Sequence, residues 1–385
     1  MEMEIGKGKK GRMAFGFDDI AIVPSRRTRD PEDVDISWEI GGFHFKLPVL
    51  ASAMDAVVDT KLAIEMGKLG GLAVLNLEGL QTRYEDPASI FQEIAGFSDE
   101  EATRKLQEIY QESIKPELIA LRIREIKEAG VIAAGSFTPQ KVERYYKIAL
   151  EAGLDILVIQ GTVVSAEHVS SRREPLDLHK FIASIDVPAI VGGCASYATA
   201  LHLMRTGAVG VLVGVGPGAA CTTRQVLGVG VPQATAISDA AAARTRHLDE
   251  TGKYVQVIAD GGMRTGGDIA KAFACGADAV MIGAPIARSK EAPGKGYHWG
   301  MATFHPELPR GTRVYAGIAA SLKEILIGPA HENDGTLNLF GALRTSMATC
   351  GYENIKSFQK AEVIVAPSIQ TEGKLLQKIQ GMTTP

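Results

Sequence analysis

An α/β chain folded as a (β/α)8 barrel is the fold class that the sequence predicts. Eight short apolar runs occur along the chain, each is followed by a stretch of helical character, and several end in glycine. The runs are continuously apolar, which is typical of parallel strands buried on both faces. Eight such units close into a barrel of about 250 residues. A doubly wound open sheet shows the same alternation of strand and helix but seldom has eight units.

The predicted strands are evenly distributed except for one long gap. They are PVLASAM (48–54), GLAVLN (71–76), VIAAGSF (131–137), DILVIQG (155–161), PAIVGG (188–193), VGVLVGVG (209–216), VQVIADGG (255–262) and AVMIGA (279–284). Residues 78–130 are too long for an ordinary connection and contain helix-favouring sequence such as SDEEATRKLQEIYQES. We predict a helical excursion packed on the barrel wall after the second strand. A separate regulatory module is the alternative, although some 50 residues is small for an independent core.

The region after the eighth strand predicts a cover and a return segment. Residues 293–309 contain Gly, Pro, His and Trp without periodicity, and residues 293–345 are therefore predicted to form a flap region over the barrel mouth. A helix-like FGALRTSMATCGY and an apolar AEVIVAP follow, and we expect them to fold back onto the barrel. The whole chain, residues 1–385, is predicted to be one TIM-barrel domain.

Composition excludes several classes of protein. The chain has 41 basic and 45 acidic residues, a net charge of -4 and no long block of one sign, so it has no electrostatic stripe for nucleic acid. No apolar run reaches the roughly 18 residues of a membrane helix, and the amino terminus lacks the apolar core of a signal peptide. We therefore expect no membrane association and a cytoplasmic location. The four cysteines have no zinc-ligand spacing and indicate no disulfide framework.

Two adjacent strand ends predict a phosphate and sugar site. Active sites of such barrels lie at the carboxyl ends of the strands, and the loops after strands seven and eight often hold phosphate. The glycines at these ends allow backbone N–H groups to approach a phosphate closely, and Asp260 can accept hydrogen bonds from two ribose hydroxyls. The residues concerned are Asp260, Gly261, Gly262, Gly283 and Ala284. Tight turns without a ligand are the alternative.

The loop after strand six contains the best candidate nucleophile. Its sequence, GVGPGAACTTR at 214–224, places Cys221 among glycines and hydroxyls at the barrel mouth, with Arg224 three residues further on. A reactive thiolate needs such exposure and nearby donors or positive charge. Cys194 is the rival at the same end of the barrel, whereas Cys275 and Cys350 fit buried apolar positions. The glycines before Cys221 also leave carbonyls that can coordinate a monovalent cation.

Three segments together resemble the IMP dehydrogenase and GMP reductase family. GPGAACTTRQVLGVGVPQ (216–233) resembles its catalytic cysteine loop, SAMD (52–55) its first strand end, and ADGGMRTGGDIAKAFACGADAVMIG (259–283) its phosphate segment. The likeness runs from about residue 15 to about residue 352, except in residues 78–130. The dehydrogenases usually carry a pair of CBS modules there, so the chain resembles the short, CBS-free, IMP dehydrogenase-related branch. Regulation by adenine nucleotides through CBS modules is not expected.

The resemblance implies a role for each matching residue. Cys221 would attack purine C2 to form a covalent thioimidate, and Thr223 would take part in proton transfer. The implied ligand is a purine nucleoside 5′-monophosphate, GMP or IMP, with NADPH or NAD as cofactor and K+ as the loop cation. Homo-oligomers, tetrameric or octameric, are also implied. The remaining implied contacts are Ser52, Asp260, Gly261, Gly262, Gly283 and Ala284 for the nucleotide, Gln160, Gly161 and Thr162 for the cofactor, and the carbonyls of Gly216, Gly218 and Cys221 for the ion.

The cysteine loop resembles the reductase version more than the dehydrogenase version. The dehydrogenases also need an Arg-Tyr pair that activates water, and no Arg-Tyr dipeptide follows the eighth strand. We therefore predict GMP reductase, which converts GMP and NADPH to IMP and ammonia. IMP dehydrogenase, which converts IMP and NAD to XMP, is the first alternative. An FMN-dependent barrel enzyme and a catalytically silent nucleotide-binding protein are the others.

Two residue assignments stay open within this interpretation. The reductases usually carry a flap glutamate that protonates the leaving amine, and Glu324 is the nearest counterpart in this chain. Arg26, Arg27 and Arg29 would pair with a 2′-phosphate and so favour NADPH, since Arg binds phosphate in a bidentate manner. A solvated basic turn is the alternative for these three arginines.

Overall fold

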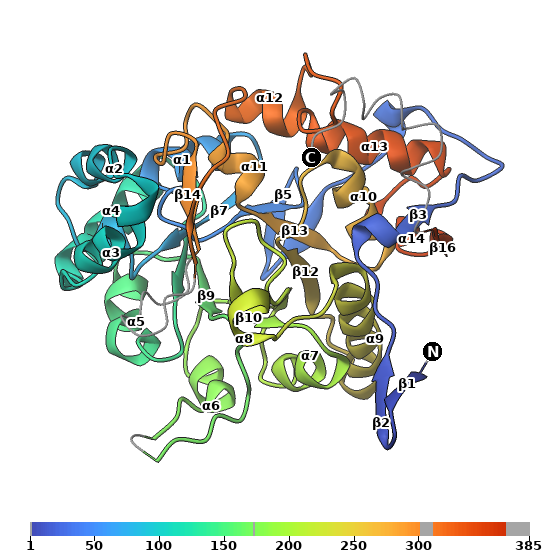
Figure 1. Cartoon of the computed structure of the whole chain (residues 1–385), viewed down its shortest axis with the longest axis horizontal. Coiled ribbons are helices and arrows are strands. Elements are labelled where there is room, and N and C mark those ends of the chain that lie inside the picture. The colour runs from blue at the N-terminus through green and yellow to red at the C-terminus, as the bar shows by residue number, and fades with distance from the viewer. Residues whose placement is uncertain (1, 172–173, 301–310, 367–385) are drawn as a thin grey trace.

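Eight parallel strands close into a barrel, which confirms the predicted TIM fold (Figure 1). The computed structural model describes residues 2–171, 174–300 and 311–366. Each strand pairs with its sequence neighbours, and the eighth strand pairs with the first. The barrel strands are β6 (Val49–Ala51), β7 (Leu72–Asn76), β8 (Ala134–Phe137), β9 (Ile156–Gln160), β10 (Ala189–Cys194), β11 (Gly210–Val213), β12 (Gln256–Asp260) and β13 (Ala279–Ile282).

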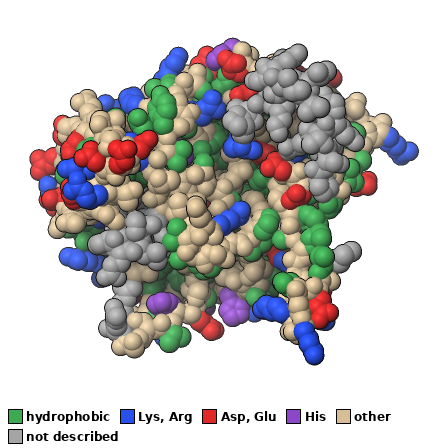
Figure 2. Space-filling view, in the orientation of Figure 1, with side chains coloured by type: hydrophobic (Ala, Val, Ile, Leu, Met, Phe, Trp, Pro, Cys, Tyr) green, Lys and Arg blue, Asp and Glu red, His purple; other side chains and the backbone are tan. Residues whose placement is uncertain are grey.

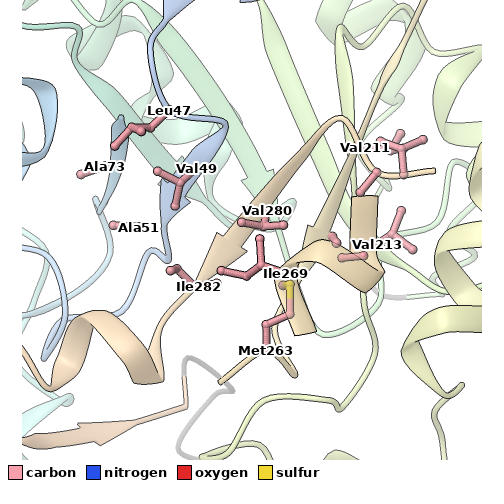
Figure 3. Packing of buried hydrophobic residues seen from close by; sticks show 14 of the residues in the cluster. Leu47, Val49, Ala51, Ala73, Val211, Val213, Met263, Ile269, Val280 and Ile282 are labelled. Carbon is pink, nitrogen blue, oxygen red and sulfur yellow. The ribbon is translucent and has the colours of Figure 1, made fainter. Parts of the chain in front are cut away.

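Alternate residues of each strand belong to two different apolar layers. In β13, Ala279 and Met281 face the barrel interior, and Val280 and Ile282 face the surrounding helices. Because side chains alternate across a strand, both faces must be apolar, which explains the continuous runs in the sequence. Figure 3 shows Ile269 of the helix α10 lying against Val280 and Ile282 in the outer layer.

The outer layer is a ring of helices that follow the strands. α4 packs against α1 and α5, α7 packs against α9, and α9 packs against α10. The ring helices are α1 (Thr60–Lys68), α4 (Pro116–Glu128), α5 (Val142–Glu151), α6 (Leu178–Ala183), α7 (Tyr197–Met204), α9 (Gln233–Thr251), α10 (Gly266–Ala274) and the short α11 (Ala284–Ala287). A further short helix, α8 (Thr223–Leu227), lies between β11 and α9.

A hairpin closes the amino-terminal end of the barrel. Strands β4 (Trp38–Ile40) and β5 (Phe43–Phe45) precede the first barrel strand, and Trp38, Ile40 and Phe45 pack with the inward-facing barrel residues. The Gln256 side chain, at the start of β12, donates to the Glu39 carbonyl at 2.7 Å. Since this end is plugged by aromatic side chains, the open end of the barrel is the one at which the strands finish.

Residues 78–130 form helices, one of which belongs to the ring. The segment contains the 3-10 turn η3 (Leu80–Thr82), α2 (Pro87–Ala95), α3 (Asp99–Ile109) and α4. α4 fills the ring position between α1 and α5, so α2 and α3 are the additional elements beside the barrel (Figure 1). Their apolar faces pack in a cluster with Ala56 and Trp299.

The chain after β13 forms a hairpin over the mouth and then returns along the barrel. β14 (Tyr297–Trp299) pairs with β15 (Arg313–Tyr315), and residues 301–310 of the predicted flap lie outside the described part of the chain. β16 (Val363–Val365) pairs with β3 (Ile20–Ile22) near the amino terminus. The remaining elements are β1 (Glu2–Gly6), β2 (Lys9–Arg12), η1 (Phe17–Asp19), η2 (Pro31–Asp33), α12 (Leu322–Ile327), α13 (Leu339–Thr349) and α14 (Ile355–Phe358).

The surface has no field of one sign in the view of Figure 2, where acidic and basic side chains are mixed. Among the described residues, no helix is long and apolar enough to cross a bilayer.

Candidate active site

A single cleft at the carboxyl ends of the strands contains every predicted site residue. Its volume is about 1180 Å³, and its floor includes the last inward-facing side chains of four strands, Asn76, Ser136, Gln160 and Asp260. The predicted residues that line it are Ser52, Gln160, Gly161, Thr162, Gly216, Gly218, Cys221, Thr223, Asp260, Gly261, Gly262, Gly283 and Ala284. Segments that are far apart in sequence therefore meet at one mouth, as the barrel topology requires.

The half-buried Cys221 lies on the cleft wall and is hydrogen-bonded to its second neighbour. Its Sγ–H donates to Thr223 Oγ1 at 3.1 Å, and Thr223 is fully buried at the start of α8. Arg224 fixes the loop by donating to the carbonyls of Val215 and Val231 at 3.3 and 2.7 Å. Burial lowers the pKa of Arg224, and the nearby Cys221 opposes that shift. The thiol is thus accessible and has a polar partner and a cation beside it, as a nucleophile requires.

None of the other three cysteines lines the cleft, and burial raises the pKa of each of their thiols. Cys194 is 1% exposed, and burial raises the pKa of its thiol to about 12. A register shift between Gly192 and Cys194 turns its side chain from the barrel mouth to the outer layer. Burial raises the pKa of Cys275 to about 11 and also raises the pKa of Cys350. Cys221 is therefore the candidate that the structure supports.

Asp260 is a half-buried carboxyl group at the floor of the cleft. Burial raises its pKa to about 7, and a hydrogen bond from Gln160 Nε2 at 3.1 Å partly opposes that shift. The Gln233 side-chain amide donates to the backbone carbonyls of Val213 and Asp260 at 2.8 and 3.0 Å, which ties together the ends of β11 and β12. The Asp260 carboxyl group is thus held in place by its neighbours. Hydrogen-bond donors on a ligand would stabilise its ionised form.

The loop after β12 packs directly against the cysteine loop. Gly261 and Gly262 have φ of +77° and +81°, a backbone conformation that favours glycine. A Cβ on Gly262 would lie 2.9 Å from Cβ of Pro217, so no side chain fits between the loops. Gly283 is equally close to the first strand end, since a Cβ there would lie 2.7 Å from Sδ of Met54. The glycines of these two neighbouring strand ends thus line the same cleft as Ser52.

The three predicted cofactor residues, Gln160, Gly161 and Thr162, all line the cleft. The Gln160 amide is engaged with Asp260, and the backbone of Gly161 pairs with Gly192 and Gly193 at 2.9 and 3.0 Å. Pockets for a single small ligand have volumes of about 300–1,000 Å³, and the volume of this cleft, about 1180 Å³, exceeds that range. The cleft is therefore large enough for a second ligand beside a mononucleotide, and the cofactor contacts of Gln160, Gly161 and Thr162 stay a prediction.

The cysteine loop contains the three residues whose carbonyls the family resemblance assigns to a monovalent cation, Gly216, Gly218 and Cys221. Gly216 has φ of +78°, and the Cys221 amide donates to the Gly218 carbonyl at 3.0 Å, so the turn gathers its carbonyls within six residues. The set has no carboxylate, which divalent cations prefer. Within the described residues, no group of three or more His, Cys, Asp or Glu side chains forms a metal site.

Sequence reasoning missed three side chains around the cleft. Tyr110, which follows α3, lines it and donates to the buried Asp55 carboxylate. Trp299 Nε1 donates to the Tyr110 hydroxyl at 2.8 Å, which links the excursion to the flap hairpin. His298 lines the cleft with 1% exposure. Helical periodicity identifies the apolar face of α3 but not a polar role for Tyr110, and no signal in an aperiodic loop marks His298.

The residues whose roles the sequence analysis left undecided do not line the cleft. Glu324 caps α12, where its carboxylate accepts from the Ser321 amide at 2.8 Å. Arg29 pairs with Glu353 at 3.3 Å and donates to the Gly351 carbonyl at 2.9 Å. Neither Arg26 nor Arg27 is among the residues that line the cleft.

The fold and the site define a class: a parallel (β/α)8 barrel with an accessible cysteine loop beside a glycine-rich mouth. Residues 14–374 match the family model described as the IMP dehydrogenase / GMP reductase domain. The chain belongs to this family and is an oxidoreductase of it.

Individual relatives agree with that assignment. An uncharacterized oxidoreductase of Mycobacterium tuberculosis strain H37Rv is 48% identical over 372 residues, which cover 94% of this chain and 99% of the relative. The crystal structure of an IMP dehydrogenase/GMP reductase-like protein from Corynebacterium glutamicum superposes with a TM-score of 0.90 at 45% identity, covering 94% of this chain and 97% of the other.

A more distant relative shows what this chain lacks. The inosine-5′-monophosphate dehydrogenase of Methanocaldococcus jannaschii is 26% identical, covering 94% of this chain and 95% of the relative. That alignment spans 482 positions, more than the 385 residues of this chain, so the archaeal enzyme contains sequence with no counterpart here. The chain is thus shorter than this dehydrogenase, in agreement with the resemblance to the CBS-free branch.

Proposed function

We propose that this chain is a purine nucleoside 5′-monophosphate oxidoreductase that acts at purine C2 through a covalent bond to Cys221. The preferred direction is reductive and converts GMP and NADPH to IMP and ammonia. One observation carries the proposal: Cys221, hydrogen-bonded to Thr223 at 3.1 Å, lines the same cleft as Asp260 and Ser52. A nucleophile, a ribose acceptor and a phosphate-binding mouth therefore face one ligand.

The proposed nucleotide contacts are a carboxylate for the ribose and glycine-rich strand ends for the phosphate. The Asp260 carboxylate would accept hydrogen bonds from both ribose hydroxyls, which favour its ionised form. The phosphate would lie against Ser52, the backbone of Gly262 and the backbone of Gly283, where glycines allow close approach. Because these groups surround the cysteine loop, the base would extend toward Cys221.

The first step of the proposed reaction is a substitution at C2 of GMP. The Cys221 sulfur forms a bond to C2 of GMP, and the C2–N bond breaks with its electron pair on nitrogen, which leaves as ammonia after taking up the thiol proton. No atom changes oxidation state in this step. When bound, the nicotinamide cofactor would supply the hydride that converts the thioimidate carbon to C2–H of IMP. Cys221 then departs as a thiolate and is reprotonated, with Thr223 placed to share that proton.

The direction rests on what hydrolysis would need. In the dehydrogenase direction a base must activate water against the covalent adduct, and the Arg-Tyr dipeptide of the dehydrogenases does not follow the eighth strand. The reductive direction avoids that water. IMP dehydrogenase is the second candidate, and the similarity to the M. jannaschii dehydrogenase favours it.

One experiment tests the activity and its direction together. Purified full-length protein is incubated with GMP and NADPH, and separately with IMP and NAD, while nicotinamide absorbance is followed and IMP, XMP and GMP are separated by chromatography. We expect IMP and ammonia from the first pair at the higher rate. XMP from the second pair without IMP from the first would reverse the direction. No product from either pair, or a bound flavin in the purified protein, would contradict the proposed function.

A further inference from the structure

His298 is directed toward the cleft by the geometry of the flap hairpin. It is the central residue of β14, between Tyr297 and Trp299. The Tyr297 ring packs on Tyr315 with centroids 4.7 Å apart, and Trp299 is buried in the cluster with α2 and α3. Because adjacent side chains of a strand point to opposite faces, His298 faces away from both neighbours. That face belongs to the cleft, which the residue lines.

The imidazole is buried without a partner. Its side chain belongs to a residue that is 1% exposed, and neither Nδ1 nor Nε2 has a hydrogen-bond partner in the described part of the chain. Buried polar groups in native proteins are almost always hydrogen-bonded, so two unmatched nitrogens on a cleft wall indicate a polar group supplied by a ligand. A neutral imidazole offers that group one donor and one acceptor.

The hairpin that carries His298 contacts the residues on either side of Cys221. The Thr312 amide donates to the Ala220 carbonyl at 3.4 Å, and the Gly311 amide donates to Thr222 Oγ1 at 2.9 Å. Gly300 also lies against this loop, since a Cβ there would be 3.1 Å from the Ala220 carbonyl oxygen. The structure thus fixes the histidine strand to the loop of the nucleophile.

Burial favours the neutral form of the imidazole. Burial lowers the pKa of His298 and is the single cause of that shift. The ionisable groups on the elements around it are Cys221 on the loop, Tyr110 after α3, and Arg313 and Tyr315 on β15, whereas α11 has none. Arg313 stacks on the Tyr297 ring at 4.7 Å, on the opposite face of the hairpin. At neutral pH the group is therefore ready to accept a proton.

We propose that His298 is the proton-transfer residue of this active site. The inference rests on the proposed function and assigns its missing acid and base. As the Cys221 sulfur bonds to purine C2, His298 takes up the proton that the Cys221–Thr223 pair releases. It then gives that proton to the C2 amino nitrogen as the C2–N bond breaks, and ammonia leaves.

The test compares H298Q with the parent enzyme. A general acid or base contributes about 10²–10⁴-fold to the rate, so we expect kcat to fall at least about 100-fold while the Kd for GMP changes by less than about threefold. The parent kcat should fall at acid pH, where the imidazole becomes protonated, and this acid limb should disappear in H298Q. Added imidazole should partly restore turnover in H298A, an effect that a purely structural role would not produce.

His247 provides a matched control. It lies on α9 away from the cleft lining, is 4% exposed, has an unpartnered Nδ1, and burial lowers its pKa as in His298. H247Q should keep the parent kcat and acid limb. If H298Q does not fold, H298N is used, with thermal unfolding of each variant measured beside activity.

Two results would contradict the inference in different ways. A kcat within threefold of the parent in folded H298Q, or an unchanged acid limb, would remove His298 from proton transfer and leave the proposed function intact. A parent enzyme that turns over neither nucleotide pair would contradict the proposed function itself, and the inference would fall with it.

Discussion

The Gln160 side-chain amide donates a hydrogen bond to the Asp260 carboxylate at 3.1 Å, across the mouth of the barrel. The two residues end β9 and β12, which are not neighbours in the barrel. Both have the inward-facing parity of their strands, and burial raises the pKa of Asp260 to about 7. The structure therefore holds a carboxyl group that titrates near neutrality where the ribose of a nucleotide is proposed to bind.

Asp260→Asn should weaken GMP binding by about 1.5–3 kcal/mol, because hydrogen bonds to a charged acceptor are lost. The parent should also bind more weakly as pH falls below about 7. Ribose hydroxyls bind the ionised carboxylate. Below its pKa Asp260 must first release a proton, and the free energy of that release weakens binding. Calorimetric titration with GMP between pH 5.5 and 8 measures both effects. The GMP affinity of the variant should depend less on pH than that of the parent. The substitution should also weaken the binding of deoxy-GMP less than it weakens the binding of GMP. Equal GMP affinity in the two proteins would exclude Asp260 as the ribose ligand.

Cys221→Ala should abolish turnover but leave GMP affinity within about tenfold, which is about 1.4 kcal/mol. The phosphate and ribose contacts lie on other loops, and they remain in the variant. Cys194→Ala is the control, since that thiol is buried in the outer layer, and it should stay active. Steady-state rates and equilibrium dialysis with GMP check the two statements. Full activity without the Cys221 sulfur would rule out a covalent mechanism.

The sequence was sufficient for the barrel because every strand contributes a continuous apolar run. The sequence also predicted the position of the active-site mouth. The carboxyl ends of parallel strands, where residues such as Asp260 lie, must meet at the same end of the barrel. Two features could not be predicted. The register shift that turns Cys194 outward arises where β10 pairs with β11. Pairing register depends on both strands, so the sequence of one strand does not predict it. The direction of His298 depends on the packing of Tyr297 and Trp299, which belongs to tertiary structure.

Potassium should raise the rate, and lithium should not. The carbonyls of Gly216, Gly218 and Cys221 are proposed to form an all-oxygen, uncharged donor set, and such a set would select ions by cavity size and field. The Gly218 carbonyl already accepts from the Cys221 amide, so an ion there would order the loop that carries the nucleophile. Initial rates in potassium and lithium chloride at matched ionic strength provide the measurement. Identical rates in the two salts would remove the cation from the mechanism.

Tyr110→Phe should destabilise the protein by about 1–3 kcal/mol, because it removes a hydroxyl that donates to the buried Asp55 and accepts from Trp299 Nε1. Asn76 Nδ2 would remain as a partner of Asp55, at 3.1 Å. Tyr84→Phe is the matched control in the same excursion. Its hydroxyl donates to the Ile109 carbonyl at 2.8 Å and has no charged partner among the described residues, so its loss should cost about 0.5–1.5 kcal/mol.

The penalty in Tyr110→Phe should also depend on pH. Burial raises the pKa of Asp55 from 3.8 to about 6, and the hydrogen bond from Tyr110 limits that rise. A carboxyl group with a raised pKa binds its proton more tightly in the folded state, so the free energy of unfolding falls as pH rises through this window. Without the hydroxyl the pKa of Asp55 rises further, and the fall extends to higher pH. Urea unfolding at pH 5 and pH 8 should therefore show a larger penalty at pH 8 for Tyr110→Phe and the same penalty at both for Tyr84→Phe. Penalties that match in size and do not change with pH would show that the Tyr110 hydroxyl does not support the Asp55 carboxylate.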